Sequence, residues 1–213
     1  GYRRETLAPR GVELHDNPRW NSTNMVASFM CARSFLEPDD DLIVSYTDIV
    51  YGPDHIQKLT AAAPSHEAAI ISDEWWLTLW SERCHDPLDD AETFVVDETS
   101  HVVNLGEQPD RLDQVQGQFT GLIRLPREVL PSILSLHDEL STRAGFTFRG
   151  RTMENLYMTD FLQLMIAGGI PVRAVPVQGG WFEIDTPGDL ALGERLFDSL
   201  EPGPWRSPDA SWP

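Results

Sequence analysis

Apolar residues are arranged along this chain in two ways, as continuous runs and at helical spacing. The continuous runs at 42–46 and 68–72 are typical of strands buried on both faces. Further strands are expected at 116–125 and 172–177. Apolar residues at helical spacing, bounded by capping residues, Pro or Gly, predict helices over 24–37, 53–62, 127–143, 152–167 and from 187 to about 200.

This order of helices and buried strands predicts an α/β fold with a mainly parallel sheet flanked by helices. The alternating segments 92–97 and 101–105 add an antiparallel hairpin as an insertion. A chain of 213 residues forms one domain by default, which we expect over residues 1–200. The Pro- and Ser-rich stretch 201–213 is expected to be a tail.

Composition and net charge limit the classes of molecule that this protein is expected to bind and the compartment it is expected to occupy. The formal net charge of −18, with Lys58 as the only lysine, argues against nucleic acid and anionic membranes. No apolar run approaches the length of a transmembrane helix, and the N-terminal residues lack the apolar core of a signal peptide. Cys31 and Cys84 show neither CxxC spacing nor a zinc-binding pattern, so we expect a reducing, cytoplasmic compartment.

Two acidic elements are the candidates for metal binding. In GGWFEIDTPGDL, residues 179–190, strand alternation puts Glu183 and Asp185 on one face, and Thr186 is a suitable N-cap for the helix that follows. Asp48 directly follows the strand at 42–46, and ligands of open α/β sheets bind outside the carboxyl ends of the strands.

Together these carboxylates offer the hard oxygen ligands that suit Mg²⁺ bound to substrate phosphates. The alternative reading needs no metal at all. Glu183 and Asp185 would then belong to a solvated edge strand, and Asp48 would be a turn-forming residue or a helix cap.

Six blocks of the sequence, taken in order, resemble a known enzyme family. They are NPRWNSTNMVASFMCAR, IVSYTDIVY, LWSERCHDPLDDAETF, GQFTGLIRL, YMTDFLQ and WFEIDTPGDL. From Gly1 to about Leu196 the chain is similar to the small cytidylyl- and nucleotidyltransferases of the sugar-phosphate nucleotidyltransferase superfamily. The nearest likeness is to bacterial enzymes that activate phosphocholine, aminoalkylphosphonates or phosphorylated glutamine for cell-surface polysaccharides.

The resemblance implies a Rossmann-like, GT-A-like sheet and a reaction of two substrates. An oxygen of a small phosphorylated or phosphonate acceptor attacks the α-phosphorus of a nucleoside triphosphate, with CTP expected, and pyrophosphate leaves. Mg²⁺ is the implied cofactor, and Asp48 and Asp185 match the metal-binding, catalytic aspartates of the family. Glu183 is a further candidate ligand, and Asn24 resembles a family residue near the nucleotide.

The sequence departs from the family pattern at its beginning. The family opens with a strand and a Gly-rich loop bearing an Arg, followed by a Lys, which hold the triphosphate, whereas GYRRE corresponds to the end of its second strand. We therefore expect either a fragment or a chain that has lost nucleotide binding. In either case the chain as it stands should turn over nucleotide very poorly.

Five other side chains are candidates for binding the acceptor. Trp76 and Trp80 share a helix face, which suits an aromatic cage for a quaternary ammonium, although such a face more often packs in the core. Arg83 is a candidate for the acceptor phosphate, with an ion pair to an acid in DPLDDAE, residues 86–92, as the alternative. Glu92 and Asp160 are candidates for a substrate ammonium or hydroxyl, with solvated-surface and helix-cap roles as alternatives.

Three functions stay open on the sequence alone. The first is a Mg²⁺-dependent nucleotidyltransferase that uses CTP. The second is a GT-A-type glycosyltransferase, which usually has a D-x-D motif, whereas YTDIVY has a single Asp. The third is a non-catalytic remnant or a partner-dependent fragment. The acceptor, the base preference and the oligomeric state, a homo-oligomer included, are also open.

Overall fold

The computed structural model describes residues 2–6, 11–36, 40–62 and 64–198, and the tail expected over 201–213 lies outside them. The α-helices are α1 (Met25–Met30), α2 (Pro53–Ala61), α3 (Trp76–Arg83), α4 (Leu130–Thr142), α5 (Met158–Ala167) and α6 (Pro187–Asp198). The strands are β1 (Leu42–Ser45), β2 (Ile49–Tyr51), β3 (Ala68–Asp73), β4 (Phe94–Val96), β5 (Val102–Leu105), β6 (Gln118–Leu125), β7 (Thr147–Phe148), β8 (Arg151–Thr152), β9 (Val172–Val177) and β10 (Trp181–Glu183). Within the described ranges, no helix combines the length and the apolar character needed to cross a membrane.

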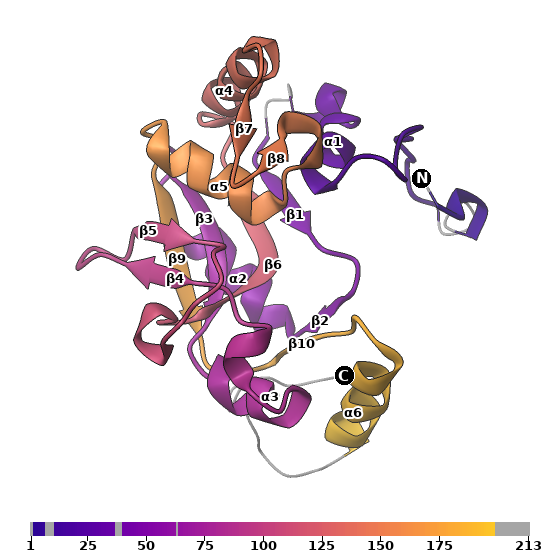
Figure 1. The fold of residues 1–213 in the computed structure, drawn as a ribbon, viewed down its shortest axis with the longest axis vertical. Coiled ribbons are helices and arrows are strands. Elements are labelled where there is room, and N and C mark those ends of the chain that lie inside the picture. The colour runs from indigo at the N-terminus through magenta and orange to yellow at the C-terminus, as the bar shows by residue number, and fades with distance from the viewer. Residues whose placement is uncertain (1, 7–10, 37–39, 63, 199–213) are drawn as a thin grey trace.

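In the described part of the chain, the central sheet has four strands in the order β1-β6-β3-β9 (Figure 1). β1, β3 and β9 run in the same direction, whereas β6 runs antiparallel between β1 and β3. The sheet is therefore mainly parallel in strand direction, as predicted, with β6 as the exception. β4 and β5 pair antiparallel and form the predicted hairpin insertion.

β3 is buried along its whole length because its two faces pack against different layers. Ala68 and Ile70 belong to the hydrophobic cluster that includes residues of α4 and α5. Ala69 and Ile71 belong to a second cluster, which includes residues of α2. This two-sided burial explains why the strand appears in the sequence as a continuous apolar run. A third cluster joins α3, β10 and α6, which lie together at the lower end of Figure 1.

Two helices are shorter than the sequence predicts. The helix expected over 24–37 forms as α1 and a separate 3-10 turn at Arg33–Phe35, and Asn24 is the N-cap of α1. The segment expected as one helix over 152–167 forms a 3-10 turn at Met153–Asn155 and then α5. Its start is fixed by Asp160, whose carboxylate accepts the backbone N–H of Tyr157 at 3.1 Å.

β2 and β10 form a separate two-stranded antiparallel ladder beside the central sheet. Just beyond its paired residues, the N–H of Ile184 donates to the carbonyl of Asp48 at 2.9 Å. The ladder thus joins the two acidic elements found in the sequence. α6 follows at once, and the hydroxyl of Thr186 accepts the N–H of Asp189 at 3.2 Å, which confirms Thr186 as a cap of this helix.

Gly121 lies in β6 at an irregularity of the β3–β6 pairing, and two constraints require glycine there. Its φ is +81°, which L side chains rarely adopt. A Cβ at this position would also lie 2.7 Å from Cγ of Tyr46, so the tyrosine ring packs against bare backbone. Gly121 therefore allows the Tyr46 ring to sit where it does at the end of β1.

The variant Gly121→Ala should be destabilised more than a variant that suffers from backbone strain alone. Gly145 is the matched control, because its φ is +70° and a Cβ there meets nothing within 4 Å. Gly145→Ala should cost about 1 kcal/mol of unfolding free energy through the positive φ. Gly121→Ala should cost about 1–3 kcal/mol more through overpacking against Tyr46. Urea unfolding of both variants measures the difference, and equal losses would contradict the steric role of Gly121.

Candidate active site

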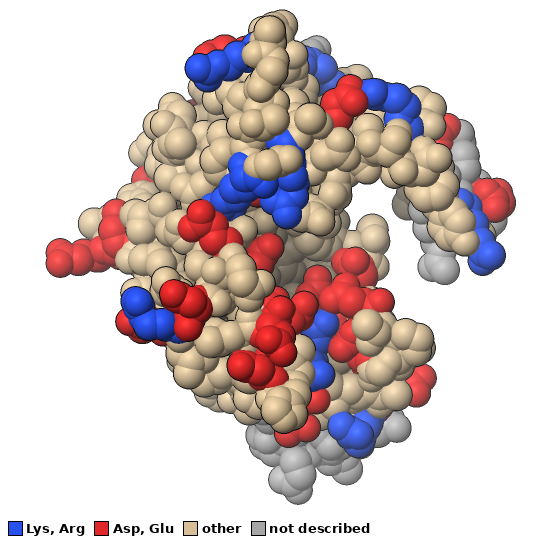
Figure 2. All heavy atoms as spheres, in the orientation of Figure 1, with Lys and Arg blue, Asp and Glu red and all other residues tan. Residues whose placement is uncertain are grey.

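A cavity of about 450 Å³ lies between the end of β1, the start of β6, the start of α5 and the end of β10. Its lining is both aromatic and acidic and includes Tyr46, Trp80, Phe119, Tyr157, Asp90, Glu92, Glu183 and Asp185. Figure 2 shows the molecule hollowed at its centre, with acidic side chains gathered below the hollow and basic ones above it. Convergent carboxylates and rings in one cavity make it the candidate active site.

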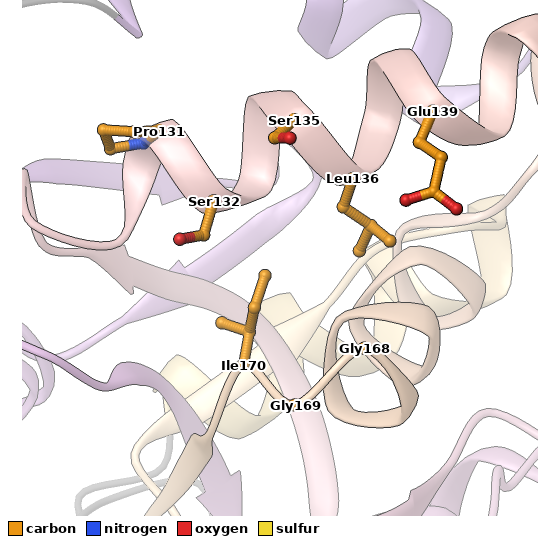
Figure 3. A pocket seen from close by; sticks show the side chains of 8 residues that line it. All are labelled: Pro131, Ser132, Ser135, Leu136, Glu139, Gly168, Gly169 and Ile170. Atoms are coloured by element: carbon orange, nitrogen blue, oxygen red, sulfur yellow. The ribbon is translucent and has the colours of Figure 1, made fainter.

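A second hollow, of about 460 Å³, lies between α4 and the turn that ends α5 (Figure 3). Ser132, Ser135 and Glu139 of α4 line one side of it, and Gly168, Gly169 and Ile170 line the other. This lining does not bring together carboxylates from different elements. We therefore take it as a surface hollow and build the site on the first cavity.

The β2–β10 ladder brings Asp48 beside the segment that carries Glu183 and Asp185. Glu183 and Asp185 line the cavity. Burial raises the pKa of Glu183 to about 7, and repulsion from Asp185, Asp48 and Asp90 adds to this rise, while Arg83 opposes it. These carboxylates therefore act on one another electrostatically, and the group holds more negative charge than Arg83 balances.

Arg83, in the last turn of α3, is embedded in this acidic group. Its side chain is 4% exposed, with Nε 3.0 Å from Oδ1 of Asp189 and Nη2 3.0 Å from Oδ2 of Asp185. Its Nη1 lies 3.7 Å from Glu183 and 3.8 Å from Asp90. Of the acids at 86–92 considered from the sequence, Asp90 lies at 3.8 Å, and the closest partners of Arg83 are instead Asp185 and Asp189, each at 3.0 Å.

A second charged group, two acids with two arginines, adjoins the cavity through Glu92. The carboxylate oxygens of Asp160 lie 3.4 Å from Nη1 of Arg149 and from Nη1 of Arg151. Glu92 lines the cavity and accepts from Thr159 at 3.5 Å. Burial and the charge of Asp160 raise the pKa of Glu92, and the two arginines oppose the rise. Glu92 thus faces the cavity, whereas Asp160 caps α5 and holds the arginines.

The two candidate tryptophans of α3 have different surroundings. Trp76 is buried in the core, and its Nε1 donates to the carbonyl of Val115 at 3.1 Å. Trp80 lines the cavity, and its ring stacks on Trp181 with 5.7 Å between the ring centroids. The Trp80 ring also lies 4.8 Å from Cζ of Arg83, so it contacts a cation of the protein itself. Trp76 therefore has the core position given as its alternative, and Trp80 is the tryptophan at the cavity.

Comparison with curated proteins decides the family. CTP:phosphoglutamine cytidylyltransferase from Campylobacter jejuni is 36% identical to this chain over 180 residues, which cover 83% of the chain and 69% of that protein. The chain belongs to this family of nucleotidyltransferases. No protein-family model matches the sequence.

Solved structures share the fold of this nucleotidyltransferase. CTP:phosphocholine cytidylyltransferase from Streptococcus pneumoniae matches with a TM-score of 0.61 and 14% identity, over 92% of this chain and 73% of that chain. The inositol-1-phosphate CTP transferase from T. maritima matches with a TM-score of 0.51 and 17% identity, over 84% of this chain. This chain spans 66% of the length of the T. maritima protein.

Several cavity residues of the nucleotidyltransferase are not evident from its sequence. Tyr46 follows an aliphatic run and could have been noticed there, whereas Tyr157 precedes Glu183 by 26 residues with no local pattern that links the two. Arg149 and Arg151 lie beside the cavity rather than in its lining, and they flank a glycine with no spacing that indicates their shared partner, Asp160. Asn24, the candidate near the nucleotide, uses its side-chain oxygen to cap α1.

The donor set fits a hard divalent cation that is also bound by a substrate. Asp48, Glu183 and Asp185 supply carboxylate oxygens, and their mutual repulsion reflects uncompensated negative charge. Among the described residues, no group of three or more His, Cys, Asp or Glu side chains is arranged to hold a metal ion by itself. Mg²⁺ commonly takes one or two carboxylates and completes its shell with water and substrate phosphates. The residues present fit that mode of binding.

Asp73, at the end of β3, ties together the segments that lead into α3 and into β10. Its Oδ1 accepts the N–H of Trp75, just before α3, at 2.9 Å, and the N–H of Gly179, just before β10, at 2.8 Å. The side chain is fully buried, and its Oδ2 has no hydrogen-bond partner. Burial raises the pKa of Asp73 from its ordinary 3.8 to about 6, although both backbone bonds oppose the rise.

The variant Asp73→Asn should therefore change the pH dependence of stability. Because the pKa of this carboxyl is higher in the folded state, the free energy of unfolding decreases as the pH rises from 3.8 to about 6. Above that pH the full decrease persists. Asparagine keeps one acceptor oxygen and does not ionise. The stability of wild type relative to Asp73→Asn should fall by up to roughly 3 kcal/mol between pH 4 and pH 7. Urea unfolding across this range measures it, and a difference that does not change with pH would contradict the raised pKa.

Proposed function

We propose that this nucleotidyltransferase transfers a cytidylyl group from CTP to a small phosphorylated acceptor, with Mg²⁺ as cofactor and pyrophosphate as the second product. The observation that carries the proposal is the cavity whose acidic wall holds Glu183 and Asp185 beside Asp48. The relative from C. jejuni, named for CTP and phosphoglutamine, supports the choice of nucleotide and of acceptor class.

The residues around the cavity have distinct proposed roles. Asp48 and Asp185 would hold Mg²⁺, whose charge would offset the repulsion between the two reacting phosphates. Glu183 is a further candidate ligand. Tyr46 and Phe119, with ring centroids 5.8 Å apart, form an apolar wall that would exclude water and orient the acceptor. In this mechanism the protein contributes mainly position and charge.

The other functions considered from the sequence have less support. The relative and the two solved structures reported above are cytidylyl- or CTP transferases, which favours this function over a GT-A-type glycosyltransferase. A non-catalytic or partner-dependent role is separated from the proposal by turnover. Pyrophosphate release by the full-length protein, with CTP and a set of phosphorylated acceptors, is the deciding assay.

The variant Asp185→Asn should lose Mg²⁺-dependent turnover while keeping its fold. Asparagine retains the size of the side chain and one acceptor oxygen, but it removes the charge that a hard dication requires. We expect turnover of the full-length protein to fall by at least about 100-fold, with little change in the thermal melt. Asp48→Asn should behave in the same way.

Asp138→Asn is the matched control for this experiment. Asp138 also pairs with an arginine, Arg33, through bonds of 2.7 Å, but it lies on α4, outside the lining of the cavity. Its turnover should equal that of wild type. Wild-type turnover in Asp185→Asn would return this stretch to its alternative reading, an acidic edge strand that leads into a capped helix.

We also propose that the acceptor carries a cationic nitrogen and that Glu92 binds it. Glu92 is mostly buried in the cavity, and aromatic rings such as Tyr46 and Tyr157 share the lining with it. Carboxylates and aromatic faces both attract ammonium groups. An acceptor that is neutral away from its phosphate would leave this carboxylate without a matching charge.

The variant Glu92→Gln should therefore lose discrimination between phosphoethanolamine and ethyl phosphate, which lacks the ammonium. Wild type should favour phosphoethanolamine, and the variant should raise the KM for it by roughly 10-fold, because a charged hydrogen bond is lost. The KM for CTP should not change. Glu139→Gln, in the hollow of Figure 3, is the control. Unchanged discrimination in Glu92→Gln would exclude Glu92 as the binding group.

A further inference from the structure

The guanidinium of Arg83 bridges two aspartates that lie four residues apart. Nε binds Asp189 and Nη2 binds Asp185, each at 3.0 Å. The ring of Trp80 covers the group at 4.8 Å from Cζ, and Trp80 in turn stacks on Trp181 of β10. The side chain is 4% exposed, so the guanidinium is enclosed by these partners.

Asp189 extends this bridge to the backbone that carries Asp185. Its Oδ1 binds Arg83, while its Oδ2 accepts the N–H of Asp185 at 3.2 Å and both the N–H and the hydroxyl of Thr186 at 2.8 Å. Arg83 and Asp189 therefore hold the turn at 185–186 through its main chain as well as through the carboxylate of Asp185. We call this arrangement the Arg83–Asp189 clamp.

The clamp leaves Asp185 accessible. Arg83 contacts Oδ2 of Asp185, whose side chain is 46% exposed and lines the cavity. Asp189, by contrast, is buried, with a side chain that is 10% exposed. The two aspartates of the clamp thus differ in role, because Asp189 is enclosed by its partners and Asp185 is presented to the cavity.

We propose that Arg83 is a positioning residue, which acts through the clamp to hold the carboxylate of Asp185 where a divalent cation binds in the cavity. The proposal rests on the function proposed above. It differs from the expectation that Arg83 contacts the acceptor phosphate, because the Nε and Nη2 of Arg83 are engaged by carboxylates. Hydrogen-bonded partners of metal ligands typically contribute 10–100-fold to metal affinity.

Positioning and charge predict opposite changes in divalent-cation affinity when Arg83 is replaced, which makes the proposal testable. A guanidinium beside a cation site repels the cation, so its removal should tighten divalent binding if Arg83 only balances charge. Loss of positioning should weaken that binding instead. Variants that conserve charge separate the two effects best, because their electrostatic contribution is nearly unchanged. Arg83→Lys replaces the planar fork by a point donor, and Asp189→Glu moves the carboxylate that braces the turn.

The experiment measures Mn²⁺ binding to the full-length protein by electron paramagnetic resonance, with Mn²⁺ alone as the probe. Thermal melts establish a temperature at which each variant is folded. We expect Arg83→Lys and Asp189→Glu each to raise the Kd for Mn²⁺ by roughly 10-fold or more, and Arg83→Met to raise it as well. Arg124→Lys is the control, because Arg124 pairs with Asp41 at 2.7 Å through a side chain that is also only 10% exposed. Its Kd should match that of wild type.

The possible outcomes separate this proposal from the proposed function. If Asp185→Asn binds Mn²⁺ as wild type does, the metal role of Asp185 fails and the positioning role fails with it. If Asp185→Asn loses binding while both charge-conserving variants keep it, only the positioning role of Arg83 is overturned. Tighter binding by Arg83→Met would identify Arg83 as a charge-balancing residue. If one charge-conserving variant does not fold, the other decides.

Discussion

The acidic wall of the cavity depends on one buried guanidinium, that of Arg83, and the carboxylates around it. Burying Arg83 without partners would be strongly unfavourable, so its position depends on hydrogen-bond acceptors at 185, in the turn after β10, and at 189, in α6. The same contact fixes α3 against both elements, with the stacked Trp80 and Trp181 beside it. The remaining imbalance of charge falls on Glu183, whose pKa is raised by burial and by its acidic neighbours.

This distribution of charge bears on how an acidic protein can handle phosphates. The arginines beside the cavity are already engaged, Arg83 by Asp185 and Asp189, and Arg149 and Arg151 by Asp160. Each cation is therefore partly neutralised before a substrate arrives. In the proposed function, countercharge for the phosphates would come largely from a divalent ion held by carboxylates. The net charge of −18, which first appears unfavourable to a phosphate-handling enzyme, is compatible with that arrangement.

The sequence predicts most elements of the fold because local patterns encode them. The unbroken apolar run of β3 predicts that both of its faces are buried, and the structure packs them against two layers. The cap at Thr186 is predicted by the residue types at the start of α6. The antiparallel direction of β6 is not a local property, since it depends on which strands lie on either side. The late start of α5 depends on the way Asp160 turns back to the N–H of Tyr157, which helical spacing alone does not reveal.

The same distinction, between features encoded locally and features that depend on distant segments, applies to the site. The carboxylates of the acidic wall could be named from strand ends and from the family resemblance, because each lies in a recognisable stretch. The partner of Arg83 could not, since Asp185 and Asp189 lie more than a hundred residues further along the chain. Trp76 and Trp80 share a helix face in the sequence, yet only the packing of β10 decides which of them reaches the cavity.

The stretch from Trp181 to Asp189 shows that a structural and a functional reading of one sequence need not exclude each other. The capping of α6 uses Thr186 and Asp189, and this would stabilise the helix in any context. The same carboxylate of Asp189 also binds the N–H of Asp185 and the side chain of Arg83. A cap that served only to start α6 would not need a buried arginine from α3. Because that arginine also binds Asp185, the capping of α6 and the orientation of the cavity carboxylate are parts of one hydrogen-bonded unit.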